Sequence, residues 1–195
     1  MSMPTERERK HWWLLAYAHT SFEKSLDACR LLVAQVASTD DDLYLPLAVA
    51  VHALYGRPFK SQRGVGKLPN DYIPDDWQGV HQALITFRDQ LLLHTDASTI
   101  KQAGRPLHDV VYHNIESERL FSTSDPRPRL DHYRFVSGYL PRLIQRVRRD
   151  LERIHERFGD CMPRSEGHYL LNLTGEPLFT VYESPDENIH FEPEA

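Results

Sequence analysis

Residues 77–96 read WQGVHQALITFRDQLLLHTD, and the rest of the chain can be read outward from this segment. Its apolar residues recur at spacings of three and four, which is typical of a helix that buries one face against other helices. An arginine, a carboxylate and a histidine lie near the end of this predicted helix. The apolar face consists of Trp77, Val80, Leu84, Phe87, Leu91 and Leu92.

The polar residues at the end of this helix, Arg88, Asp89 and His94, are the candidate catalytic groups. Metal-free RNA cleavage needs a base for the 2′-hydroxyl proton and a cation at the phosphorus oxygens, roles that suit His94 and Arg88. Asp89 either orients a side chain or pairs with an arginine. Positions six apart lie about 120° apart around a helix, so a second subunit would complete such a site better than one helix alone.

Three further helices are predicted around this one. Ser38–Asp42 ends the first and is expected to supply the N-cap of the second, and Gly159 ends the last. Pro141 is expected to kink the last helix or divide it in two. The four helices are predicted from Glu6 or His11 to Ala37, from Leu43 to Tyr55, from Pro74 to Leu93 and from Leu130 to Phe158.

Two segments have the composition of short β-hairpins. One pairs residues 110–115 with 120–123, and the other pairs 169–173 with 178–182. The predicted fold is therefore mainly α, an antiparallel bundle of four to five helices with short β-hairpin additions. Residues 1–160 form the helical domain of this prediction. Residues 161–195 form a C-terminal hairpin and an acidic, flexible tail.

Composition places the chain among ordinary globular proteins. Of its 195 residues, 41% are hydrophobic and 26% are charged, and the net charge is −5, which does not indicate a strongly basic nucleic-acid binder. Cys29 and Cys161 lie far apart and are expected to be reduced thiols of a cytoplasmic protein. No apolar run reaches the length of a membrane span, and residues 1–10 lack the apolar centre of a signal peptide.

Several classes of site are not indicated. The eleven histidines include no helical His-Glu-x-x-His pattern, so neither a metal nor another cofactor is expected. Residues 62–67, QRGVGK, differ from a phosphate loop in glycine spacing and lack a Ser or Thr after the lysine. Arg57, Arg63 and Lys67 either contact phosphate or, as we favour, are solvated loop charges.

The order Arg88, Asp89 and then His94, six residues after the arginine, resembles the motif of the HEPN superfamily of helical ribonucleases and nucleotide-binding domains. The likeness in architecture covers about residues 10–155. The chain also resembles uncharacterised bacterial helical proteins of this type. It implies a homodimer in which two motifs face one another across a shared cleft. It also implies a metal-independent endoribonuclease in stress or phage defence. The family branch with a tyrosine after the histidine is disfavoured, because Thr95 follows here.

Five arginines share one face of the last predicted helix. They are either an RNA-binding surface or, as we favour, a solvated face with ion pairs to Asp150, Glu152 and Glu156. If they adjoin His94 across a cleft, RNA binding is favoured. If they lie on the far side, a rival function gains: a non-catalytic helical dimer that binds a partner protein or nucleotide. The face comprises Arg142, Arg146, Arg149, Arg153 and Arg157.

Two other histidines lie on predicted helices. His81 is expected to be a surface or interface residue. His19 and Glu23 are four residues apart and can face each other. They form either a local pair at the edge of the core, which we favour, or a polar pair lining a pocket near His94.

Overall fold

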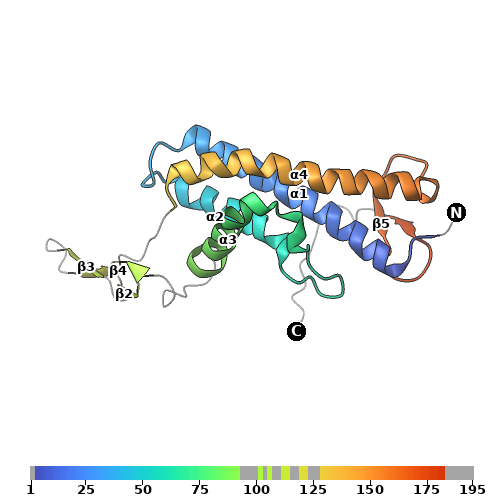
Figure 1. Ribbon diagram of the computed structural model, residues 1–195, viewed down its shortest axis with the longest axis horizontal. Helices are drawn as coiled ribbons and strands as arrows, with labels where there is room; N and C mark the ends of the chain where they lie inside the picture. Colours follow the sequence, from blue (N-terminus) through green and yellow to red (C-terminus); the bar gives the residue numbers. More distant parts are fainter. Residues whose placement is uncertain are drawn as a thin grey trace.

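The computed structural model confirms a mainly α fold, with helices that pack on one another (Figure 1). Its four α-helices within the described residues are α1 (Glu6–Gln35), α2 (Tyr44–Gly56), α3 (Gln78–Thr86) and α4 (Leu130–Phe158). Side chains are described for residues 3–89 and 128–182. Backbone is described for residues 3–92, 101–102, 105–106, 111–114, 119–122 and 128–182.

The two longest helices, α1 and α4, lie alongside each other in opposite directions (Figure 1). Glu8 near the start of α1 pairs with Arg157 near the end of α4 at 2.7 Å. At the other end, the Cys29 thiol donates to the Tyr133 carbonyl at 3.2 Å. A capping box at Thr5 and Glu8 satisfies the first backbone donors of α1 and fixes where it begins.

α4 runs unbroken through Pro141, so the helix is not divided there, and the kink that was the other expectation stays a prediction. Proline lacks the N–H that the carbonyl four residues earlier would accept, which weakens the helix locally. Buried Leu140, Leu143 and Ile144 flank the proline and pack into the core. We infer that this packing keeps the helix continuous.

The expected side-chain N-cap of α2 is also wrong. α2 begins at Tyr44, and its N-cap Leu43 provides no side-chain hydrogen bond. Asp41 instead accepts a hydrogen bond from the backbone N–H of Leu43 at 2.9 Å, so its carboxylate stabilises the preceding turn.

The central segment of the sequence is helical but not α-helical throughout. A 3₁₀ turn, η3 (Asp75–Trp77), leads into α3, and a π-helix, η4 (Phe87–Leu92), follows it. π-Helical turns are rare and are frequent at functional sites. Both α3 and η4 pack against α2. The sequence predicted a helix here but not its change of type.

Three antiparallel strand pairs complete the described structure. β3 (Val111–Asn114) pairs with β4 (Arg119–Ser122), and β5 (Tyr169–Leu171) pairs with β6 (Phe179–Val181). Both predicted hairpins are therefore confirmed. The third pair is β1 (Lys101–Gln102) with β2 (Arg105–Pro106). The predicted flexible tail, residues 184–195, lies outside the described residues.

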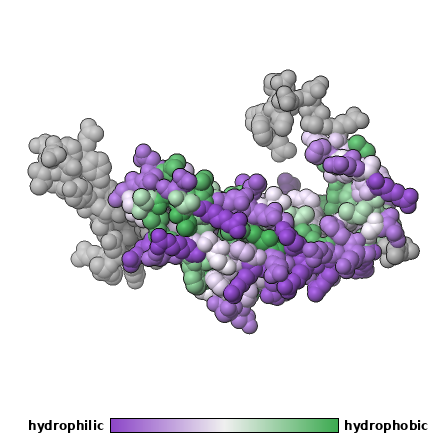
Figure 2. Space-filling view, turned by 90° about the horizontal axis from the view of Figure 1, so that it is seen from above, coloured by the Kyte–Doolittle hydropathy of each residue, from purple (hydrophilic) through white to green (hydrophobic). Residues whose placement is uncertain are grey.

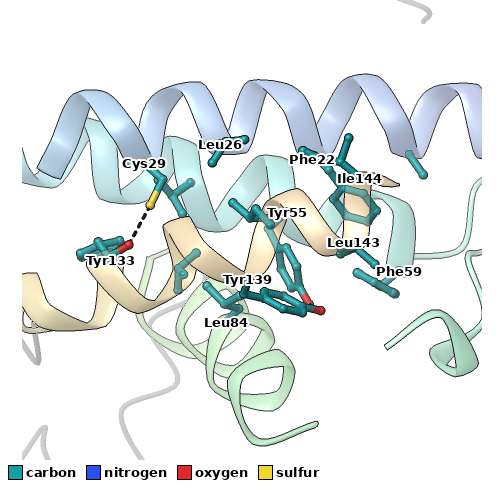
Figure 3. Packing of buried hydrophobic residues seen from close by; sticks show 14 of the residues in the cluster. Phe22, Leu26, Cys29, Tyr55, Phe59, Leu84, Tyr133, Tyr139, Leu143 and Ile144 are labelled. Atoms are coloured by element: carbon teal, nitrogen blue, oxygen red, sulfur yellow. Dashed lines mark hydrogen bonds between the residues drawn. The ribbon is translucent and has the colours of Figure 1, made fainter. Parts of the chain in front are cut away.

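The core lies between the four helices. Hydrophilic side chains cover most of the face seen in Figure 2. Beneath the surface, Phe22 of α1, Tyr55 of α2, Leu84 of α3 and Tyr139 of α4 converge in one apolar cluster (Figure 3). None of the described helices is long and apolar enough to cross a membrane.

Candidate functional site

Arg88 lies in the first turn of the π-helix η4. Its side chain is only 15% exposed and lies against the last residue of α2, Gly56. A Cβ atom at position 56 would come within 2.9 Å of Nε and 3.1 Å of Nη1 of Arg88, and closer still to Cδ. The arginine therefore occupies space that any other residue at position 56 would fill.

Gly56 is not required by the local backbone. Its φ of −76° and ψ of −20° are helical values that every amino acid adopts readily. The need for glycine is steric and comes from the arginine, which lies 32 residues away in the sequence.

Asp89 joins Arg88 to a second cation. Its Oδ1 lies 3.2 Å from Nη1 of Arg88, and its Oδ2 accepts a hydrogen bond of 2.6 Å from Nζ of Lys60. We call Arg88, Asp89 and Lys60 the RDK cluster. Lys60, just after the 3₁₀ turn η1 (Arg57–Phe59), was not predicted, and no sequence pattern marks it. Asp89 thus pairs with an arginine, one of its two expected roles, and with a lysine.

One guanidinium donor in the RDK cluster is ion-paired with Asp89 but makes no hydrogen bond within the described residues. Nη1 of Arg88 is buried and has no hydrogen-bond partner among the described residues, because the contact with Asp89 lacks hydrogen-bond geometry. Buried donors are almost always paired in native proteins. An anionic ligand would therefore meet the part of the Arg88 side chain that reaches the surface, which is 15% exposed.

A buried histidine contacts the backbone of α3, the helix that leads into η4. Nδ1 of His52 lies 3.2 Å from the Leu84 carbonyl, and Nε2 lies 3.2 Å from the Tyr133 hydroxyl. A carbonyl only accepts, so Nδ1 carries the proton and Nε2 accepts from Tyr133. In a regular α-helix the Leu84 carbonyl would pair with the N–H of Arg88. His52 was missed by the sequence analysis, although it interrupts an apolar helix.

Burial keeps His52 neutral. The side chain is fully buried, and loss of hydration lowers its pKa to about 4. The ring of His132 lies parallel to it at 5.9 Å, and burial lowers the pKa of His132 as well. Phe87, directly before Arg88, packs against both rings. The start of η4 is thereby fixed to α2 and α4.

His81 is buried, and its prediction as a surface or interface residue is wrong. It is 6% exposed, and its Nδ1 lies 2.7 Å from the Tyr55 hydroxyl. That hydroxyl also lies 3.1 Å from the hydroxyl of Tyr139. A polar ring can be buried at this position because these hydroxyls satisfy it. Burial lowers the pKa of His81.

The described part of the predicted motif is Arg88 and Asp89, which the structure brings together. His94 lies outside the described residues. Arg57 is exposed at the end of α2, and its carbonyl accepts a hydrogen bond of 3.1 Å from the Gln62 side chain. Lys67 is also exposed and lines a hollow against the first turns of α1.

One arginine of the α4 face contacts the start of the central segment, and the position of the face relative to His94 lies outside the described residues. The Arg142 guanidinium lies 5.5 Å from the Trp77 ring, at the start of the α3–η4 segment. Arg88 is eleven residues further on, about 16 Å at 1.5 Å per residue. The five arginines, including Arg146 and Arg149, are exposed along α4.

Ion pairs account for part of this arginine face. Arg153 pairs with Asp150 at 2.8 Å, as predicted. Arg157 pairs with Glu8 of α1 rather than with a neighbour on its own helix. Asp150 also accepts from the Tyr72 hydroxyl at 2.7 Å, at the end of the 3₁₀ turn η2 (Asn70–Tyr72).

His19 and Glu23 form the local pair that we favoured. Nδ1 of His19 lies 3.4 Å from Glu23 Oε2, and Arg148 of α4 contacts both side chains. Among the described residues, no group of three or more His, Cys, Asp or Glu side chains is arranged to hold a metal ion.

No protein-family model, curated protein or solved structure matches this chain.

Proposed function

We propose that this protein is a HEPN-like, metal-independent endoribonuclease, acting in stress or phage defence as the resemblance implies. The proposal assigns Arg88 to the scissile phosphate and His94 to proton transfer. Asp89 and Lys60 hold the guanidinium of Arg88 in place. The rival, a non-catalytic helical dimer that binds a partner protein or nucleotide, uses the same surface without chemistry.

The observation that carries this proposal is the restrained guanidinium of Arg88. The side chain is restrained by Gly56 on one side and by its ion pair with Asp89 on the other, and 15% of it stays exposed. A cation fixed before substrate binds pays no reorganisation cost when charge develops on the phosphorus oxygens. An arginine serving only to cap a helix would instead be expected to donate to backbone carbonyls.

The reaction that these residues suit is transesterification. His94 takes the proton from the 2′-hydroxyl, and the 2′-oxygen attacks the adjacent phosphorus. The bond from phosphorus to the 5′-oxygen breaks, and that oxygen takes a proton from solvent or from a second His94. The products are a 2′,3′-cyclic phosphate and a 5′-hydroxyl. Arg88 stabilises the negative charge on the non-bridging oxygens.

A homodimer fits this scheme, because two positions six apart on a helix lie on different faces and one chain is not expected to bring Arg88 and His94 together. Two copies related by a two-fold axis would place His94 of one beside Arg88 of the other. The proposed assembly has η4 at or near the interface. A cognate partner protein that regulates the enzyme is a further expectation from the resemblance.

The test is the chemistry of the product ends. Purified protein is incubated with total RNA and with DNA of equal length in EDTA, with His94→Ala as control, and the fragments are analysed by mass spectrometry. We expect RNA fragments with 2′,3′-cyclic phosphate ends, none from DNA and none with His94→Ala. Fragments with 3′-hydroxyl ends, or equal cleavage by His94→Ala, would contradict the mechanism.

A further inference from the structure

A second concentration of positive charge lies between the first turns of α1 and the loop after η1. A hollow of about 480 Å³ is lined there by three cations, Arg7, Lys10 and Lys67, together with His11 and one carboxylate, Glu6. The function proposed above makes no use of Arg7, Lys10 or His11.

The single carboxylate in the lining, Glu6, does not neutralise the three cations of this hollow. Glu6 pairs with Lys10 at 2.6 Å. Arg7 and Lys67 have no ion pair with the residues that the structure describes. An adjoining hollow of about 570 Å³ shares Arg7 and His11 and adds Arg157, whose charge is paired with Glu8. Glu8 also lines this second hollow, so Arg7 is the cation without an ion pair to the described residues that the two hollows share.

The loop that carries Lys67 has a defined shape. Gln62 and Gly66 exchange backbone hydrogen bonds of 2.7 and 2.9 Å, and the N–H of Leu68 donates to the Pro58 carbonyl at 2.7 Å. Gly64 and Gly66 have φ angles of 77° and 107°, which favour glycine. These contacts fix the shape of the loop, and Lys67 lines the hollow beside α1.

The same loop connects the hollow to the RDK cluster. The loop has two limbs, residues 58–62 and residues 66–68, which run in opposite directions. Hydrogen bonds between Pro58 and Leu68 and between Gln62 and Gly66 join them. Lys60 lies on one limb and pairs with Asp89, and Lys67 lies on the other and faces the hollow. Lys60 beside the Arg88–Asp89 pair and Lys67 in the hollow therefore lie on opposite limbs of one loop.

We propose that this hollow is a phosphate-binding subsite for the backbone of a single RNA strand whose scissile phosphate lies at Arg88. Arg7, His11 and Lys67 are exposed, so the hollow is shallow and suits an extended polyanion crossing the surface. The identity of the polyanion as RNA rests on the proposed function.

The test is the salt dependence of RNA binding. Fluorescence anisotropy measures binding of a fluorescein-labelled 2′-O-methyl oligouridine of about 20 nucleotides, which has no 2′-hydroxyl to attack and stays intact. Wild type is compared with the double variant Arg7→Gln/Lys67→Gln. The control is Lys24→Gln/Arg30→Gln, which removes equal charge from α1 beside Glu23 and Asp27 in the groove with α4.

Each phosphate contact contributes about −0.7 to the slope of log K against log [KCl] for a single strand. We expect Arg7→Gln/Lys67→Gln to make that slope shallower by about 1.4 and to weaken binding at low salt at least about tenfold. The control should change neither the slope nor this ratio. Equal behaviour of the two double variants, or no binding by wild type at low salt, would overturn the subsite.

The binding assay is independent of catalysis. If the protein binds RNA through Arg7 and Lys67 but does not cleave it, the subsite is supported and the nuclease proposal is contradicted. A nuclease whose affinity for RNA is unaffected by Arg7→Gln/Lys67→Gln would keep the proposed function and remove the subsite.

Discussion

Gly56 and Arg88 fit together: the arginine side chain fills the space where a Cβ at position 56 would lie. Gly56→Ala should displace the guanidinium without unfolding the protein, because the backbone there is helical and the obstructing atoms belong to a flexible side chain. Alanine is the better helix former by up to about 1 kcal/mol. We expect unchanged or raised thermal stability together with slower RNA cleavage.

Gly138→Ala is the matched control for this substitution. Gly138 lies inside α4, and a Cβ there would meet no atom of the described residues within 4 Å. We expect it to raise stability and leave the cleavage rate unchanged. Wild-type activity in Gly56→Ala would show that the position of Arg88 is not important for function.

His52 should make the fold sensitive to acid. Its pKa is lowered from 6.5 to about 4 by burial, so the unfolded chain binds the proton more readily. The stability from neutral His52 is present above pH 6.5 and is lost as the pH falls toward 4, by about 3 kcal/mol in total. Urea unfolding at a series of pH values measures this change.

His52→Leu isolates the contribution of this residue. The variant leaves the Leu84 carbonyl and the Tyr133 hydroxyl without their partner, so it should be less stable at pH 7. Its stability should fall less steeply below pH 6.5, with the remaining slope including His81 and His132, whose pKa values are also lowered. An equal slope in both proteins would show that His52 does not titrate as described.

Arg9 should anchor the C-terminal hairpin to α1. Its buried guanidinium donates to the carbonyls of Asn172 and Gly175 and pairs with Glu176 at 2.9 Å. We expect Arg9→Met to increase amide hydrogen exchange in β5 and β6, measured by mass spectrometry. Among the described residues, the half-buried Lys10 pairs only with Glu6 on its own helix, and Lys10→Ala should have little effect, since surface ion pairs are worth under about 1 kcal/mol. Unchanged exchange in Arg9→Met would show that Trp12 and Phe179 hold the hairpin alone.

The proposed composite site requires two copies of the chain. Light scattering at micromolar concentration should give the mass of a dimer for wild type. Mixing Arg88→Ala and His94→Ala chains should restore part of the activity, because mixed dimers contain one site with both intact residues. A monomer at all concentrations, or no recovery on mixing, would remove the composite site.

The sequence predicted the helices well where local signals were strong. Both ends of α4 were predicted correctly, because proline residues precede Leu130 and Gly159 follows Phe158. The contacts of the site that join residues far apart in the sequence could not be predicted. Lys60 and Asp89 are 29 residues apart, and Gly56 meets Arg88 only because α2 packs on the α3–η4 segment. Burial of His81 likewise depends on the Tyr55 hydroxyl of another helix, which periodicity does not show.

The most direct measurement is the single-turnover rate of cleavage of one defined RNA, in EDTA, by wild type and the variants Arg88→Ala, Asp89→Ala and His94→Ala. Loss of one group that stabilises the transition state costs roughly 100- to 1,000-fold in rate. We predict losses of that size for Arg88→Ala and His94→Ala, and a smaller loss for Asp89→Ala, with folding of all four proteins verified by circular dichroism. Equal rates in wild type and His94→Ala would contradict the nuclease and favour the binding protein.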